Sequence, residues 1–325
     1  MFKVGICRDL LNAHGHPIFG DKALEVLVEN PAIEWEYTPE VVTEITADMA
    51  ARYDGLHVNL AKVTRASVAR NDCRLKIVAR NGVGYDSVDV AALAEKNIIL
   101  TNTPVAVRRP VAVATLTMIF ALAGRLFQKD RLVREGRWEA RNDWMGTGLT
   151  KRTLGLVGAG GIGQEIMCVA RPFFGRMIAA DPMADAKRLN ALGCELYDLE
   201  YVMRTSDFLV ICCLLTPQTR HLINADRLSK MKSSAYLINM ARGPVVDEAA
   251  LIDALIGKVI AGAGLDVFEA EPTPVHNPLL KLDNVVLTPH ALCWTDECFH
   301  DIATSALQSI VDVSLGRKPV FVVAT

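Results

Sequence analysis

Short runs of apolar, mostly β-branched residues alternate with amphipathic segments along most of the chain. In segments such as Lys22–Glu29 and Val88–Glu95, apolar positions recur three and four residues apart, which predicts helices. Alternating strands and helices predict parallel sheets that are covered by helices on both faces. The strands expected in the N-terminal part are Lys3–Cys7, Glu34–Tyr37, Gly55–Asn59, Lys76–Arg80 and Ile98–Thr101.

The alternation changes once, after Thr101–Pro104. Two successive helices, Val111–Gly124 and Lys129–Glu135, are expected there, and a last helix is expected over Asp296–Leu315. The predicted organisation is therefore two α/β units joined by a pair of helices, for which 325 residues suffice. The strands expected in the second series are Leu154–Val157, Met177–Ala180, Phe208–Cys212, Tyr236–Asn239, Val259–Asp266 and Val285–Leu287.

Composition narrows the class of protein. The chain is 51% hydrophobic, and its 35 Lys and Arg nearly balance 37 Asp and Glu, so no electrostatic footprint for nucleic acid or an anionic membrane is expected. Eight scattered cysteines, none in a CxxC pair, are typical of a reducing compartment. The N-terminus has no signal-peptide pattern, and the longest apolar run, Pro110–Gly124, is shorter than the roughly 20 residues that a membrane helix needs. We expect a soluble, cytoplasmic protein.

A glycine-rich turn follows the predicted strand Leu154–Val157 and opens a helix. The pattern GxGxxG alone is weak, but this context is the one in which dinucleotides are bound. The first glycine makes the tight turn, the second lets the backbone approach a pyrophosphate, and the third permits close helix–strand packing. Amides at the helix start then favour the phosphates. The coenzyme-binding residues expected here are Gly158, Gly160, Gly161, Ile162 and Gly163.

The next predicted strand ends in Asp181, 23 positions after Gly158. An acidic residue there accepts hydrogen bonds from the adenosine ribose and repels a 2′-phosphate, so NAD is predicted rather than NADP. The alternative is a glycine turn followed by a solvated aspartate.

Three polar residues, Arg242, Glu271 and His290, follow predicted strands of the second unit. Ligands of open parallel sheets bind beyond the carboxyl ends of the strands, so these side chains are expected to converge. Arginine offers a fork of donors for a carboxylate, histidine exchanges a proton near neutral pH, and glutamate orients the imidazole. The alternative for each residue taken singly is a purely structural role in a turn, a helix cap or the core.

The chain resembles the D-isomer-specific 2-hydroxyacid dehydrogenase family essentially from end to end. The resemblance implies a discontinuous, flavodoxin-like substrate domain (1–102 and 291–325), a Rossmann coenzyme domain (103–290) with a cleft between them, and a homodimer formed through helices around 110–145. The matching segments are Arg80–Asp86, Thr101–Pro104, Gly158–Gly163, Asn239–Asp247, Gly262–Pro272 and Thr288–His290.

By position, Arg242, Glu271 and His290 match the catalytic residues of that family. The implied reaction is hydride transfer between NAD and a 2-oxo or 2-hydroxy acid, with His290 as the acid or base. The resemblance also places Asp266 and Thr115 at the coenzyme, and the backbone amides of Val83 and Gly84 at the substrate carboxylate, while Asn59, Leu60 and Trp294 lie at the substrate pocket.

Several positions depart from the family pattern and leave the substrate open. Val113 replaces an acidic residue, the preceding Arg108-Arg109 is unusual, and Trp294 either lines the pocket or packs on the last helix. A small polar 2-oxo acid such as glyoxylate or hydroxypyruvate is expected. Phosphoglycerate is less favoured because the chain ends 35 residues after His290.

Other functions remain open. A formate-type enzyme is disfavoured by Glu271, a phosphite-type enzyme is not, and relatives that act as NAD-sensing corepressors can keep the same residues. His14 and His16 do not complete a metal site, so no metal is expected. Cys293, close to His290, is a candidate for oxidation.

Overall fold

The computed structural model describes residues 1–323, which form two compact units. The first unit comprises residues 1–107 and the C-terminal segment from 294 onward, and the second comprises 108–293. These divisions fall after residues 107 and 293, whereas the boundaries predicted from the sequence fall after residues 102 and 290. Assigning substrate binding to the first unit and coenzyme binding to the second remains a prediction.

The first unit is built on a five-stranded sheet in the order β2-β1-β3-β4-β5, in which every pairing is parallel. This is the flavodoxin-like order, so the predicted fold class is confirmed for this unit. Its strands are β1 (Phe2–Ile6), β2 (Ile33–Tyr37), β3 (Gly55–Val58), β4 (Ile77–Arg80) and β5 (Ile99–Thr101).

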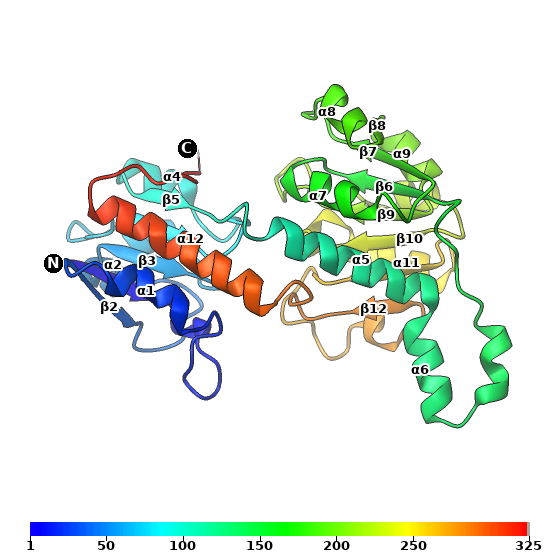
Figure 1. The fold of residues 1–325 in the computed structure, drawn as a ribbon, viewed down its shortest axis with the longest axis horizontal. Coiled ribbons are helices and arrows are strands. Elements are labelled where there is room, and N and C mark those ends of the chain that lie inside the picture. The colour runs from blue at the N-terminus through cyan, green and yellow to red at the C-terminus, as the bar shows by residue number, and fades with distance from the viewer. Residues whose placement is uncertain (324–325) are drawn as a thin grey trace. The chain divides into compact units, whose positions relative to one another are not determined.

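Helices cover both faces of this sheet, and each face has its own apolar cluster. The last helix of the chain, α12 (Asp296–Ser314), lies beside β3 and β4 (Figure 1). Its buried Phe299, Leu307 and Ile310 share a cluster with strand residues such as Val4, which makes this unit discontinuous in sequence. The other helices are α1 (Glu25–Val28), α2 (Ala47–Arg52), α3 (Arg65–Val68) and α4 (Val90–Glu95).

The second unit contains a seven-stranded parallel sheet in the order β12-β11-β10-β9-β6-β7-β8. Counted from its first strand, this is the Rossmann order with one added strand, and the order reverses between β6 and β9. The strands are β6 (Thr153–Val157), β7 (Arg176–Ala180), β8 (Cys194–Leu196), β9 (Phe208–Ile211), β10 (Tyr236–Asn239), β11 (Gly262–Leu265) and β12 (Val285–Leu287).

One face of this sheet packs against α5 and α7 and the other against α9 and α11, and each interface forms a separate apolar cluster. The helix α6 and the 3-10 turn Trp138–Asp143 extend beyond the sheet (Figure 1). The helices are α5 (Arg108–Gly124), α6 (Leu126–Arg134), α7 (Gly161–Ala170), α8 (Ala186–Ala191), α9 (Leu199–Thr205), α10 (Ala225–Ser229) and α11 (Glu248–Ile256).

The predicted helix pair is present, with different bounds. Helix α5 begins at Arg108 rather than Val111, because a proline such as Pro110 is tolerated in the first turn, where amides lack intrahelical acceptors. The chain breaks at Arg125, whose φ is +51°, before α6 begins. Within residues 1–323, no single helix is long and apolar enough to cross a bilayer. Helices α5 and α6 are long and apolar enough only when taken together, and a 58° bend separates them.

Two further predicted elements differ from the structure, and one strand in the structure was not predicted. Lys22–Glu29 divides into a 3-10 turn (Asp21–Leu24) and the short α1. The strand expected over Val259–Asp266 is shortened to Gly262–Leu265, because the residues after Lys258, whose φ is +54°, complete a turn. The edge strand β8 was not predicted, because its three residues are too short to show a period.

Candidate active site

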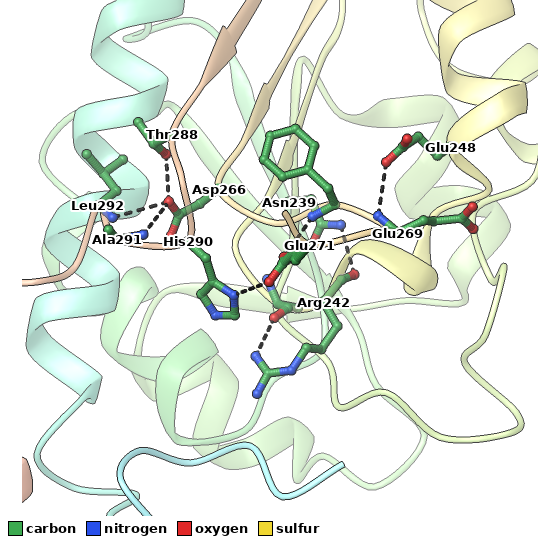
Figure 2. A network of polar contacts seen from close by, with 12 residues as sticks. Asn239, Arg242, Glu248, Asp266, Glu269, Glu271, Thr288, His290, Ala291 and Leu292 are labelled. Carbon is green, nitrogen blue, oxygen red and sulfur yellow. Dashed lines mark hydrogen bonds and ion pairs between the residues drawn. The ribbon is translucent and has the colours of Figure 1, made fainter. Parts of the chain in front are cut away.

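Three neighbouring strands bring Arg242, Glu271 and His290 to one edge of the seven-stranded sheet. Arg242 follows β10, Glu271 follows β11, and His290 follows β12. These strands are adjacent and parallel, so their carboxyl ends lie side by side. The structure therefore brings the three side chains together, as Figure 2 shows.

Glu271 and His290 form a direct pair. His290 Nδ1 lies 2.8 Å from Glu271 Oε2, while Glu271 Oε1 accepts the Phe268 amide at 2.9 Å. Burial by itself raises the pKa of the Glu271 carboxyl. The hydrogen bonds from His290 and Phe268 and the charges of His290 and Arg242 outweigh that effect, so this pKa lies below its ordinary value. An ionised Glu271 fixes Nδ1–H as the donor, which leaves Nε2 of the half-exposed imidazole for the reaction.

His290 is held in an uncommon backbone conformation by its neighbours. Its φ of +54° lies in the left-handed region, which histidine, asparagine and aspartate enter more readily than most residues. The buried Asp266 holds this segment, because its Oδ1 accepts the Thr288 hydroxyl at 2.6 Å and the amides of Ala291 and Leu292 at 3.0 and 3.2 Å (Figure 2). Burial raises the pKa of Asp266 although these hydrogen bonds oppose the shift.

The turn that carries Arg242 is fixed by Asn239 and Gly243. The buried amide of Asn239 donates to the Arg242 carbonyl at 3.0 Å and accepts the Ala241 amide at 3.1 Å. A Cβ on Gly243 would overlap the Phe268 carbonyl, so only glycine permits this close approach. Arg242 Nη1 also donates to the Ala241 carbonyl at 2.8 Å.

The glycine-rich turn connects β6 to α7 at the point where the strand order reverses. Gly158 has a φ of +102°, and a Cβ there would lie 2.7 Å from the Cys213 amide nitrogen. A Cβ on Gly163 would lie 2.6 Å from the Gly158 carbonyl oxygen, whereas nothing lies within 4 Å of one built on Gly160. The first amides of α7 have no intrahelical acceptor. The turn therefore fits a dinucleotide pyrophosphate, with Gly160 as the point of approach and the amides of Gly161 and Ile162 as donors.

Asp181 directly follows β7 and contacts the same turn. Its Oδ2 accepts the Ala159 amide at 2.7 Å, and its Oδ1 accepts the Met183 amide at 2.8 Å. The carboxylate thus positions the glycine-rich turn, an interaction that the sequence did not predict. Its expected contact with a ribose stays a prediction.

In the first unit, the expected substrate-binding residues Asn59 and Leu60 follow β3, and Val83 and Gly84 follow β4. Asn59 belongs to a largely buried chain of hydrogen bonds: His57 Nε2 lies 3.1 Å from Asn81 Oδ1, Asn81 donates to Asn59 at 3.1 Å, and Asn59 donates to Asp9 at 3.0 Å. The amide of Leu60, whose side chain is exposed, donates to the same Asp9 oxygen. Asn59 is therefore engaged in this network, and its role toward a substrate stays a prediction.

The loop after β4 presents backbone amides. Gly82, with a φ of +110°, donates to Thr103 Oγ1 at 3.0 Å, and the Val83 carbonyl accepts Asn102 at 2.9 Å. In the part of the chain that is described, the amides of Val83 and Gly84 donate to no protein acceptor. Such a pair of amides suits an anion such as a carboxylate.

Two other expected contacts have different surroundings. Thr115 is fully buried in α5, and its hydroxyl donates to the Val111 carbonyl at 2.8 Å, so the geometry gives no support to a coenzyme contact. Trp294 packs edge-on against Phe299 of α12 at 4.9 Å between ring centroids, yet 47% of it remains exposed. Both interpretations of Trp294 therefore stay open.

Among residues 1–323, no group of three or more His, Cys, Asp or Glu side chains is arranged to hold a metal ion. The cysteines at positions 7, 73, 168, 194, 212 and 213 are free thiols. Cys212 lies beneath the glycine-rich turn, where its thiol donates to the Gly158 carbonyl at 3.0 Å and burial raises its pKa. The roles of Asn239 and Thr288 were not predicted, although both lie in segments that carried the family resemblance.

Comparisons with known proteins agree with this geometry. Residues 116–291 match the sequence profile described as "D-isomer specific 2-hydroxyacid dehydrogenase, NAD binding domain". A glyoxylate reductase of Thermococcus onnurineus is 36% identical over 306 residues, which cover 92% of this chain and 91% of that protein. A D-3-phosphoglycerate dehydrogenase of Synechocystis sp. is 36% identical over 83% of this chain, which spans only 48% of that longer protein. The crystal structure of a Thermus thermophilus protein designated TT0316 superposes with a TM-score of 0.86 at 31% identity, covering 99% of this chain and 100% of that chain.

Proposed function

The chain belongs to the D-isomer specific 2-hydroxyacid dehydrogenase family, and we propose that it reduces a small polar 2-oxo acid to the D-2-hydroxy acid with NADH. The single observation that supports this proposal best is the Glu271–His290 pair, at 2.8 Å, at the strand ends of the NAD-binding unit. The family defines the reaction and the coenzyme. The substrate and the role of each residue are our proposal.

The side chains divide the chemistry between them. NADH, when bound, supplies the hydride that the carbonyl carbon of the oxo acid accepts. His290 gives the proton on Nε2 to the carbonyl oxygen, so that the oxo acid becomes a hydroxy acid and the imidazole is left neutral. Ionised Glu271 holds Nδ1–H and favours the charged imidazole before that step.

Arg242 and the loop at Val83 and Gly84 are proposed to hold the substrate. The planar guanidinium suits a carboxylate together with a carbonyl oxygen, whose developing negative charge it stabilises in the transition state. The amides of Val83 and Gly84 are proposed as further donors to the carboxylate. Asp266, buried beside the segment that carries His290, is proposed to meet the nicotinamide carboxamide.

Glyoxylate and hydroxypyruvate are the substrates that we propose first. The names of relatives support this choice: the Thermococcus protein is a glyoxylate reductase, and a similar Pectobacterium protein is a glyoxylate/hydroxypyruvate reductase. Phosphohydroxypyruvate is the competing candidate, since the Synechocystis relative is a D-3-phosphoglycerate dehydrogenase. We further propose a cytoplasmic homodimer formed through α5 and α6, where Phe120, Leu126 and Phe127 are exposed.

The substrate is tested by NADH oxidation with purified protein against glyoxylate, hydroxypyruvate, phosphohydroxypyruvate and pyruvate, repeated with NADPH. We expect turnover with NADH and one of the first two acids. A strong preference for phosphohydroxypyruvate would replace the proposed substrate. Tight NADH binding without turnover of any oxo acid would favour an NAD-sensing protein, and phosphite oxidation would favour the alternative dehydrogenase.

The role of His290 has a matched control within the same unit. His221, with a φ of +49°, pairs with Glu269 much as His290, with a φ of +54°, pairs with Glu271. Asparagine tolerates this backbone region, so His290→Asn and His221→Asn both avoid added strain. We expect His290→Asn to lower kcat by about 100- to 10,000-fold with the Kd for NADH unchanged, and His221→Asn to keep its turnover. Equal turnover in both variants would remove His290 from the chemistry.

A further inference from the structure

Arg108, the first residue of α5, lies against the glycine-rich turn although it belongs to no fingerprint. A Cβ built on Gly161 would lie 2.6 Å from Arg108 Nε and 3.0 Å from Cζ. Gly161 stands at a position of the GxGxxG pattern that does not require glycine. The guanidinium of Arg108 occupies, at the start of α7, the space that a side chain at position 161 would need.

The guanidinium of Arg108 has an unsatisfied buried donor. Its Nε is buried without a hydrogen-bond partner, and across the described chain no ion pair or hydrogen bond engages its other nitrogens. The adjacent Arg109 differs, because its Nε lies 2.7 Å from Glu165 Oε1 on α7. Arg109 therefore has an acidic partner on α7, whereas Arg108 has none among the described residues.

The surroundings of Arg108 favour an anion as the partner of its two Nη nitrogens, since Nε itself is buried. The first turns of α5 and α7 both carry the positive end of a helix dipole, and two arginines start α5, where a cation is unfavourable. The Arg109 charge is offset by Glu165 and the Arg108 charge is not. A negative group bound here would meet unpaired amides and a guanidinium at once.

We propose that Arg108 binds the coenzyme pyrophosphate together with the first amides of α7. This inference rests on the proposed use of NAD by this chain. The guanidinium fork matches two phosphate oxygens, and it approaches from α5 rather than from the glycine-rich turn itself. Gly161 then has a defined role, because its lack of a side chain lets an arginine from another helix reach the phosphates.

Binding measurements separate this proposal from a structural role. The Kd values of NADH, ADP-ribose and adenosine are measured for the wild type, Arg108→Gln and Arg109→Gln, with thermal melting as a check of folding. We expect Arg108→Gln to weaken NADH and ADP-ribose by about 10- to 100-fold, since both carry the pyrophosphate, and to leave adenosine unchanged. Arg109→Gln, which removes a neighbouring charge, is expected to change these Kd values by less than about threefold.

A double-mutant cycle tests the contact with Gly161 directly. Alanine suits a helix start, so Gly161→Ala acts mainly by displacing Arg108. We expect Gly161→Ala to weaken ADP-ribose in the wild-type background and to have little effect in Arg108→Gln, since the displaced group is already absent. Additive losses would overturn the proposed contact.

Other outcomes are equally decisive. Wild-type affinity for NADH and ADP-ribose in Arg108→Gln would overturn the inference while leaving the proposed function intact. An equal loss of adenosine affinity would show that Arg108 only supports the shape of the turn. Loss of ADP-ribose binding in an enzyme that reduces none of the tested oxo acids would support the inference and reject the proposed substrate. A wild-type chain that binds neither NADH nor ADP-ribose would reject both.

Discussion

At the scale of single residues, the proposed chemistry depends on Glu271, whose carboxylate has two hydrogen-bond partners. One oxygen accepts the Phe268 amide and the other faces His290, so the carboxylate cannot rotate away from the imidazole without losing a bond. Its lowered pKa keeps it ionised well below neutral pH. The pair therefore carries opposite charges whenever His290 is protonated, which is the form that donates a proton.

Glu271→Gln keeps the shape of this contact and removes its charge. In the proposed reduction, the charged imidazole gives up its proton, and the glutamine no longer holds that imidazole through a charged contact. We expect a loss of at least about tenfold in kcat/KM with the Kd for NADH unchanged. Steady-state kinetics and NADH titration measure this, with Glu269→Gln as the matched control beside His221. A wild-type kcat/KM in Glu271→Gln would contradict the positioning role.

At the scale of elements, two glycines in the connection between β6 and α7 differ in what requires them. Gly163 is required by packing, because a Cβ there would press on the Gly158 carbonyl oxygen at 2.6 Å. Gly160 is not required by packing, because a Cβ there meets nothing within 4 Å, and its backbone angles suit alanine. We propose that glycine is needed at position 160 because the coenzyme approaches the backbone there.

Alanine substitutions distinguish the two positions. We expect Gly160→Ala to melt within about 2 °C of the wild type and to bind NADH at least about tenfold more weakly, because its methyl group enters the space of the pyrophosphate. We expect Gly163→Ala to lower the melting temperature by several degrees, through a forced shift of the helix start. Thermal melting and NADH titration of both variants check this. Normal NADH affinity in Gly160→Ala would argue against the proposed coenzyme approach.

The hydrophobic pattern of the sequence predicted most of these elements but missed the short ones at the edges. Strand–helix alternation predicted both parallel sheets, because strands buried on both faces read as short apolar runs. It did not predict β8, which is three residues long, nor the start of α5 at Arg108, where proline follows two arginines. Short edge elements depend on pairing with a neighbour, which leaves no period in their own sequence.

At the scale of the whole molecule, stability is expected to depend on pH through His57 above all. His57 is fully buried in the first unit, and burial, helped by the charge of Arg80 and opposed by the bond to Asn81, lowers its pKa from 6.5 to about 4. The unfolded chain binds the proton more tightly, so the stability that neutral His57 contributes is complete above pH 6.5 and is lost as pH falls toward 4. The loss amounts to about 3 kcal/mol.

The other shifted groups at the site act differently over this range. The raised pKa of Asp266 increases the free energy of unfolding as pH falls. The lowered pKa of Glu271 decreases it, but only once pH falls below the ordinary pKa of a glutamate. His57→Gln, which can still donate to Asn81, is expected to flatten the decline of unfolding free energy between pH 7 and 4.5. Urea unfolding at several pH values measures it. An unchanged slope in the variant would show that His57 is not the responsible group.

Local spacing along the chain determined much of this protein: two parallel sheets, a dinucleotide turn at one strand end, and three polar residues at others. These features could be predicted because the polarity of neighbouring residues indicates which segments are buried strands and which are the helices that connect them. Only the tertiary structure decided that Asp181 holds the glycine-rich turn, that the Thr115 side chain on α5 is fully buried, and that Arg108 fills the space beside Gly161. The contacts of Asp181 and Arg108 join residues that are distant in sequence. They and the burial of Thr115 depend on how helices and strands pack, which no local pattern records.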